Sequence, residues 1–138
     1  MADLSQTAAN VGLTNDAGSQ IDASKVYGEA VTQGNAVYLK TSDNKYWKAD
    51  ADAAATASAD GIALTPGAAD EYGVVCTEGY VDLGATLTVG ETYVVSTTAG
   101  GIAPIADLGS GDYTTILGVA TAADTLELNI YVSGVAKA

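Results

Sequence analysis

The sequence predicts an all-β fold, a small β-barrel or sandwich of two pseudo-repeated halves with an extended N-terminal arm. Short runs rich in Val, Ile, Tyr and Thr recur along the chain, and Gly-rich turns separate them, which is typical of sandwiches and small barrels. Similar sequence also returns at an offset of roughly 55–57 residues. The length of 138 residues fits one compact domain with a short extension.

The predicted strands follow one another in both halves of the chain. A hairpin over 36–40 and 45–48 is expected to turn at Asp43 and Asn44, because these residue types favour tight turns. Further strands are expected at 61–64, 72–77, 92–96, 101–105, 114–119 and 126–132. The strand interpretation requires buried apolar positions, for which we select Val37, Leu39, Val94 and Ile116. The Ala-rich segment 49–59 is either a short helix with acids near its start or a loop.

The internal repeat covers three pairs of segments. Residues 29–39 (EAVTQGNAVYL) resemble 85–95 (ATLTVGETYVV), 60–65 resemble 117–121, and 75–81 match 130–135 loosely. Two units are too few for a solenoid, which needs at least about three repeats. The repeat therefore predicts two related halves that close one barrel.

Residues 1–25 differ from the domain predicted over 26–138. They are rich in Ala, Asn, Gln, Ser, Thr and Asp, and they show no sustained period of strand or helix. We interpret them as an arm, mobile or extended in the free protein, that binds a partner; a frayed end without a role is the alternative. The apolar side chains that would make this contact are Leu4, Val11, Leu13 and Ile21. On this view, a chain without residues 2–24 still folds.

Composition excludes several classes of function. Seventeen acids stand against five Lys and no Arg, giving a net charge of −12, which opposes binding to nucleic acid or to an anionic membrane surface. The chain has no His, so it lacks the commonest acid–base catalyst, metal ligand and partner of a nucleophile. No secretory signal or membrane span is visible. We expect no enzymatic activity.

No motif for a cofactor or metal stands out. Asp50 and Asp52 do not begin a calcium loop, because Ala54 and Ala55 occupy positions that need an oxygen ligand and a glycine. The Gly-rich stretches match neither a dinucleotide-binding nor a phosphate-binding loop. Cys76 lies in an apolar run with no Lys beside it, which indicates an inert thiol. We therefore expect no cofactor, no metal and no catalytic residue.

One local patch combines lysines with aromatic residues, namely Lys40, Lys45, Tyr46, Trp47 and Lys48. Alternation along a strand places Tyr46 and Trp47 on opposite faces, so at least one is expected to be partly exposed. The functional interpretation is a contact with a partner or a sugar. The structural interpretation, which we favour, is that Trp47 covers one end of the barrel while the lysines protect an edge strand.

The chain resembles the small head decoration (capsid cement) proteins of tailed bacteriophages over about residues 27–137. The resemblance lies in 79–90 (GYVDLGATLTVG), 92–104 (TYVVSTTAGGIAP), 111–113 (GDY), 117–121 (LGVAT) and 132–136 (VSGVA). In the first half it lies in 34–39 (GNAVYL), 45–50 (KYWKAD) and 61–64 (GIAL). These motifs consist of turns and strands, and similar modules occur in other virion parts.

The resemblance implies a β-barrel-like domain without enzymatic activity that binds the outer surface of the capsid and stabilises it. Its expected partner is the major capsid protein, its expected state a homo-oligomer, often a homotrimer, and its expected location the virion after synthesis in the host cytoplasm. The alternatives are a head-fibre base, a tail-associated module, or a carbohydrate-binding β module that would use Tyr46 and Trp47. The resemblance supplies no site residues, and no part of it covers the arm.

Overall fold

The computed structural model describes residues 3–14 and 19–138 and confirms the all-β fold class. In this part of the chain, ten strands form one antiparallel sheet in the order β4-β3-β5-β6-β10-β9-β7-β8, with β1 and β2 paired to β6. The strands are β1 (Val11–Leu13), β2 (Gln20–Asp22), β3 (Ala36–Lys40), β4 (Lys45–Lys48), β5 (Gly61–Ala63), β6 (Val75–Leu83), β7 (Thr92–Val95), β8 (Ile102–Pro104), β9 (Tyr113–Ala120) and β10 (Thr125–Ala136). Two single turns of 3-10 helix cover Ala8–Asn10 and Ile105–Asp107.

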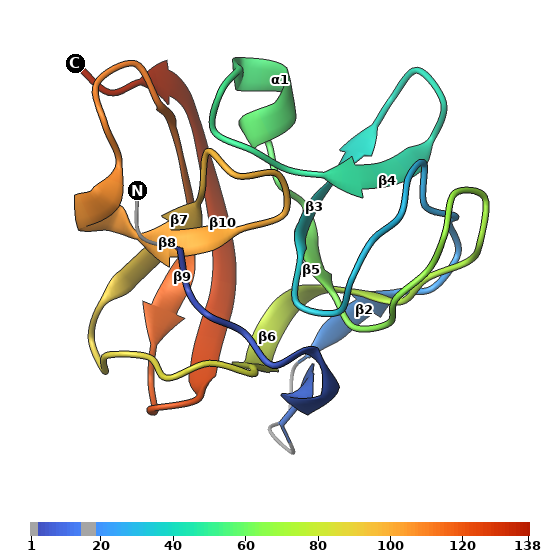
Figure 1. The fold of residues 1–138 in the computed structure, drawn as a ribbon, viewed down its shortest axis with the longest axis horizontal. Helices are drawn as coiled ribbons and strands as arrows, with labels where there is room; N and C mark the ends of the chain where they lie inside the picture. The colour runs from blue at the N-terminus through green and yellow to red at the C-terminus, as the bar shows by residue number, and fades with distance from the viewer. Residues whose placement is uncertain (1–2, 15–18) are drawn as a thin grey trace.

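The two halves of the sheet repeat one topology, as the sequence predicts. Outward from the β6–β10 pair, one half runs β6-β5-β3-β4 and the other β10-β9-β7-β8. Figure 1 shows the halves side by side, with β6 passing beneath them. The register also repeats: Ala36 opposite Ile62 and Val37 opposite Gly61 correspond to Thr92 opposite Val119 and Tyr93 opposite Gly118.

One of the three repeat alignments has the wrong register. The sequence match places Val75 on Ile130, whereas in the structure Val75 pairs with Ala63 of β5 and Leu126 pairs with the equivalent Ala120 of β9. Val75 therefore corresponds to Leu126. The likeness of residues 75–81 to 130–135 reflects only shared strand composition, because the ladder pairs and not residue types set the register.

The repeated glycines have a steric reason. A Cβ on Gly61 would overlap the backbone carbonyl oxygen of Cys76 in β6, and a Cβ on Gly118 would overlap that of Glu127 in β10. The register above makes Cys76 and Glu127 equivalent positions. In each half, a neighbouring strand thus approaches the glycine at the equivalent position closely. Close approach of another backbone is a recognised reason for glycine inside a strand.

β6 joins the halves because it changes partners along its length. Its first part lies between β2 and β5, and its last part lies between β1 and β10. The change occurs at Gly79, whose φ of 108° is disfavoured for any residue with a Cβ. Beyond this point β5 and β10 diverge, so the sheet curls around a common interior.

One core serves both halves. Its largest cluster combines Ile62 and Cys76 from the first half with Tyr93, Leu117 and Leu126 from the second. Two smaller clusters flank it, one around Tyr27 and Val75 and one around Val94 and Leu108. The shared cluster joins the two halves, since neither half has a separate cluster of comparable size.

The N-terminal segment is extended, as expected, but it is docked on the domain. β1 and β2 pair with β6, Leu4 packs against the main core, and Val11 is only 6% exposed. The Gln6 side chain donates hydrogen bonds to the carbonyl oxygens of Gly34 (3.1 Å) and Leu83 (3.0 Å). The expectation of an arm lying outside the domain is corrected for residues 3–14 and 19–24; residues 15–18 lie outside the described part.

Other local expectations are met to different degrees. Val37 and Val94 are fully buried, as predicted, whereas Leu39 and Ile116 are only partly buried. Within the segment 49–59, only α1 (Ala54–Ala57) is helical, and the rest is loop. Among the described residues, no helix is long and apolar enough to cross a bilayer.

Candidate functional site

The described residues contain no cluster that resembles a reactive centre. No group of three or more Cys, Asp or Glu side chains among them is placed to hold a metal ion. Cys76 is free and fully buried, and burial raises the pKa of its thiol, which disfavours the nucleophilic thiolate. The contact residues predicted from the sequence lie on β4 and in the N-terminal segment.

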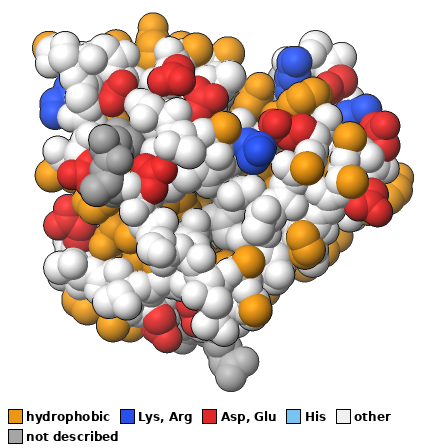
Figure 2. Space-filling model, in the orientation of Figure 1, with side chains coloured by type: hydrophobic (Ala, Val, Ile, Leu, Met, Phe, Trp, Pro, Cys, Tyr) orange, Lys and Arg blue, Asp and Glu red, His pale blue; other side chains and the backbone are white. Residues whose placement is uncertain are grey.

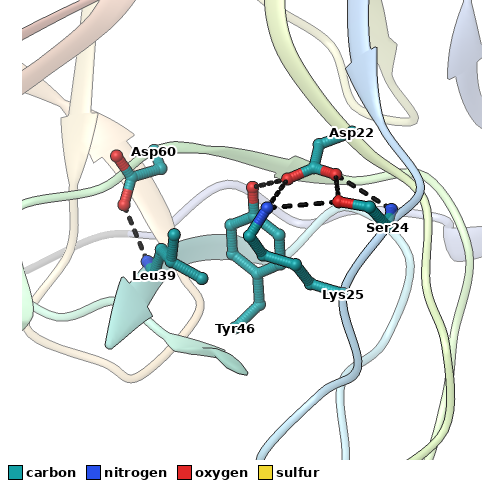
Figure 3. Close-up of polar contacts among 6 residues, drawn as sticks. All are labelled: Asp22, Ser24, Lys25, Leu39, Tyr46 and Asp60. Atoms are coloured by element: carbon teal, nitrogen blue, oxygen red, sulfur yellow. Dashed lines mark hydrogen bonds and ion pairs between the residues drawn. The ribbon is translucent and has the colours of Figure 1, made fainter. Parts of the chain in front are cut away.

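Asp22 anchors the end of the N-terminal segment to β4 (Figure 3). Its carboxylate accepts hydrogen bonds from the Ser24 backbone N–H (2.9 Å), the Ser24 hydroxyl (2.6 Å), the Lys25 Nζ (2.9 Å) and the Tyr46 hydroxyl (2.8 Å). These four donors hold one partly buried carboxylate in a fixed position, so the network joins β2 to β4 across the surface of the domain.

The network shifts the pKa of both its acidic members. Hydrogen bonds from Ser24, followed by that from Lys25, hold the pKa of the Asp22 carboxyl well below its ordinary value of 3.8. Burial, and then the bond to Asp22, raises the pKa of Tyr46 well above its ordinary value of 10.0. Asp22 is thus ionised and Tyr46 neutral at physiological pH, which is the arrangement that their hydrogen bond needs.

The prediction that Tyr46 contacts a partner is therefore corrected. Its side chain is 3% exposed, it packs in the cluster around Tyr27, and its hydroxyl is occupied by Asp22. The sequence predicts that Tyr46 and Trp47 face opposite sides of the strand, and this is confirmed, because Trp47 is only partly buried. Tyr46 can occupy the buried face because its hydroxyl has a hydrogen-bond acceptor there.

Replacing Asp22 with Ala should lower the free energy of unfolding by about 1–3 kcal/mol, because the buried Tyr46 hydroxyl loses its acceptor. Urea unfolding monitored by circular dichroism measures this. Asp52→Ala is the matched control, since Asp52 is exposed and its carboxylate has no hydrogen bond or ion pair within the described residues. An equal effect of the two substitutions would contradict the anchoring role of Asp22.

The loss of unfolding free energy caused by Asp22→Ala should become smaller as the solution is made acidic. Because the pKa of Asp22 is depressed in the folded state, its contribution is fully present above the ordinary value of 3.8 and is lost as the pH falls towards the folded-state pKa. The difference in unfolding free energy between wild type and variant should be constant above roughly pH 5 and shrink in more acidic solution. A difference that grows on acidification would contradict this assignment.

Trp47 is held in place by its own neighbours. Its Nε1 donates to Asp43 (3.1 Å), Lys40 Nζ lies 4.7 Å from the ring centroid, and the ring packs so closely on Gly28 that a Cβ there would overlap it. The two lysines of β4 have acidic partners, Lys45 with Asp70 (2.6 Å) and Lys48 with Glu29 (3.9 Å). This geometry supports the structural interpretation of the lysine–aromatic patch.

The four apolar candidates of the N-terminal segment divide into two pairs. Leu4 packs against the core and Val11 is buried, so these two are corrected from partner contacts to core residues. Leu13 is 43% exposed and Ile21 is 54% exposed, so both remain available to a partner. They lie on β1 and β2, which both run along β6.

Sequence reasoning missed the exposed apolar end of β10. Tyr131 is 63% exposed, Val132 41% and Val135 64%. The sequence predicts a strand over 126–132, but β10 continues to Ala136, which carries these side chains past the last residue that pairs with β6. The uncharged run 128–136 predicts a strand, whereas its lack of a second neighbour depends on where β6 changes its partner from β10 to β5.

Two hollows lie on the surface near β6. One, of about 490 Å³, is polar and lies between the N-terminal segment and the β6–β7 connection, where Ser5, Thr7, Asp82 and Asp124 line it. The other, of about 380 Å³, lies between β6 and β10 and is described below. Asp82 and Asp124 of the first hollow accept hydrogen bonds from Gly84 and Thr125, so they support local turns.

Comparison with known proteins gives no relative: no protein-family model, no curated protein and no solved structure matches this chain.

Proposed function

We propose that this protein is a virion structural component, a head decoration protein that binds the outer surface of a phage capsid through the major capsid protein and stabilises it. The proposal starts from the resemblance over residues 27–137. The observation that supports it most is that the resembling segments occupy strands and turns in both halves of the fold, around one shared core. The resemblance thus extends over the whole domain and is not a local match.

The physical properties of the domain suit such a role. A clamp on a shell needs a stiff body and several attachment points rather than reactive groups. A trimer, which the resemblance implies, supplies three linked contacts, so modest individual affinities combine into tight attachment. The net charge of −12 keeps free subunits soluble and apart from nucleic acid, although salt screens it beyond about 8 Å.

The contact surface that we propose includes Leu13 and Ile21. Both are exposed apolar side chains on short strands of the docked N-terminal segment, and apolar side chains that remain in water often mark interfaces. Because β1 and β2 are already paired with β6, attachment does not require the segment to fold on the shell. Little ordering entropy then opposes binding.

Co-sedimentation of the purified protein with capsids that lack decoration tests the proposal, with purified tails as the parallel sample. We expect saturable binding to capsids alone. The double variant Leu13→Ser/Ile21→Ser should bind roughly thirtyfold more weakly, since each of the two lost apolar contacts is worth on the order of 1 kcal/mol. Val89→Ser, which changes an apolar side chain elsewhere that is 63% exposed, is the control. Binding to tails alone would contradict the decoration role and favour a tail-associated module.

No observation specifically favours the carbohydrate-binding or head-fibre alternatives. Sugar binding by aromatic side chains needs an open ring face, and Lys40 lies over the Trp47 ring while Gly28 lies against it. Tyr46 is buried. Decoration therefore remains the one function that we propose.

A further inference from the structure

The last part of β10 has a strand neighbour on one edge only. Its ladder with β6 ends where Leu128 pairs with Gly79, whereas its ladder with β9 continues to the pair between Ala136 and Tyr113. Within residues 3–14 and 19–138, no strand pairs with the other edge of 129–136. An unpaired edge presents backbone N–H and C=O groups that can template another strand.

The side chains along this edge are suited to such a neighbour. Residues 129–136 (NIYVSGVA) contain no charge and no proline, the two residue features that commonly prevent pairing at an edge. Tyr131 and Val132 pair with Ile116 and Thr115 of β9, between two irregularities in the ladder, so this stretch is a formed strand and not a frayed end. Both side chains are exposed and would be covered by an added strand.

A groove accompanies the edge at the point where β5 and β10 diverge. It has a volume of about 380 Å³ and is lined by Ala59, Asp60, Thr77, Glu78, Asn129, Ile130 and Val132. Figure 1 shows that β10 and β5 diverge above β6 and that α1 lies beside the upper end of β10. The groove therefore gives an incoming chain a place to lie beside β10.

The charge of the groove distinguishes between possible occupants. Glu78 is exposed, and its carboxylate has no hydrogen-bond or ion-pair partner among the described residues. The nearby Asp60 carboxylate accepts a bond from the Leu39 N–H (2.7 Å), and no lysine lines the groove. Blue side chains in Figure 2 gather mostly on the half that contains β3 and β4. The groove thus favours a cationic neighbour, and a second copy of this chain, with a net charge of −12, is disfavoured.

We propose that the free edge of β10 accepts a strand from a partner protein, an extended segment of alternating apolar and small polar residues that carries Lys or Arg. The main chain of that segment would pair with β10 over 129–135, and its basic side chain would reach Glu78. In strand addition of this kind, main-chain hydrogen bonds supply affinity and side-chain contacts supply selectivity. The inference goes beyond the proposed function and does not depend on it, since it concerns the isolated protein.

Synthetic peptides test the proposal directly. The probe is an eight-residue peptide of alternating Val and Thr with Lys at both ends, and its counterpart has Glu at both ends. We expect the Lys peptide to bind in an NMR titration and to slow hydrogen exchange of amides within 129–135. We expect the Glu peptide to bind at least about tenfold more weakly, because it meets Glu78 and the net negative charge.

Backbone methylation separates strand addition from charge attraction alone. Alternate amides of a strand point to opposite edges, so N-methylation of one alternating set should abolish binding and methylation of the other should change affinity less than about twofold. Glu78→Gln should lower the affinity for the Lys peptide by about two- to fivefold, the range expected for an exposed ion pair. Glu91→Gln, which removes the same charge at the start of β7, should leave the affinity unchanged.

Three results would overturn the inference. Equal binding by both methylated peptides would mean that charge alone attracts the probe. Protection confined to amides outside 129–135 would place the site elsewhere. Dimerisation of the unliganded protein in sedimentation experiments, with the β10 amides protected, would make a second copy the occupant.

Discussion

Deletion of residues 2–24 is expected to lower the midpoint of thermal unfolding by roughly 10 °C or more, or to abolish cooperative unfolding. The deletion removes β1 and β2, which form ladders with β6, and it uncovers the core where Leu4 and Val11 pack. Loss of two such apolar side chains alone costs on the order of 3–6 kcal/mol. The loss falls on β6, the one strand that both halves share, so its effect should reach both of them.

A matched pair of substitutions within β1 separates the contribution of buried side chains from that of the strand pairing itself. Val11→Ala should lower the unfolding free energy by about 1–2 kcal/mol, because Val11 is buried, while Leu13→Ala should change it by less than about 0.5 kcal/mol, because Leu13 is 43% exposed. Differential scanning calorimetry of the three variants measures both effects. An unchanged midpoint for the truncated protein would restore the independent arm that the sequence predicts.

Gly118→Ala is expected to destabilise the protein by about 1–3 kcal/mol or more, although it adds a single methyl group. The new Cβ would overlap the backbone carbonyl oxygen of Glu127, and a ladder strand cannot move aside as a flexible side chain can. β10 must then shift away from β9 or lose its pairing there. Urea unfolding measures the change, and faster hydrogen exchange of the amides in 125–128 would locate it.

The repeat supplies a second test of the same argument. Gly61→Ala should act in the same direction, because its Cβ would overlap the carbonyl oxygen of Cys76 in the equivalent place. Gly12→Ala is the control, since nothing lies within 4 Å of a Cβ at that strand glycine. If Gly12→Ala proved as harmful as the other two, general strand propensity and not the close approach of strands would explain the effect.

Much of the fold could be predicted because its signals are local. The hairpin of β3 and β4 follows from Asp43 and Asn44 between two apolar runs, and Asn44 indeed has a positive φ of 59°. The repeat of Gly61 and Gly118 indicated two related halves, and the equal registers of β3–β5 and β7–β9 confirm them. Such features depend on a few neighbouring residues and therefore survive in a single sequence.

The candidate contact residues were harder to predict because their exposure depends on distant partners. Val11 and Leu13 look alike in sequence and both pair with β6, yet Val11 is buried and Leu13 is 43% exposed. Tyr46 is buried because Asp22, far away in the chain, accepts its hydroxyl. Strands of three residues, such as β1 and β2, are too short for a period of two to appear.

Taken alone, the sequence determined the all-β class, the two related halves, the hairpin turn and the strong negative charge, because turn chemistry and side-chain alternation act over a few residues. Only the tertiary structure decided that the N-terminal segment is docked on β6 and that the end of β10 has a free edge. Both outcomes depend on which strands lie beside β6. Pairing between segments far apart in the chain is set by the packing of the whole core, which no local pattern records.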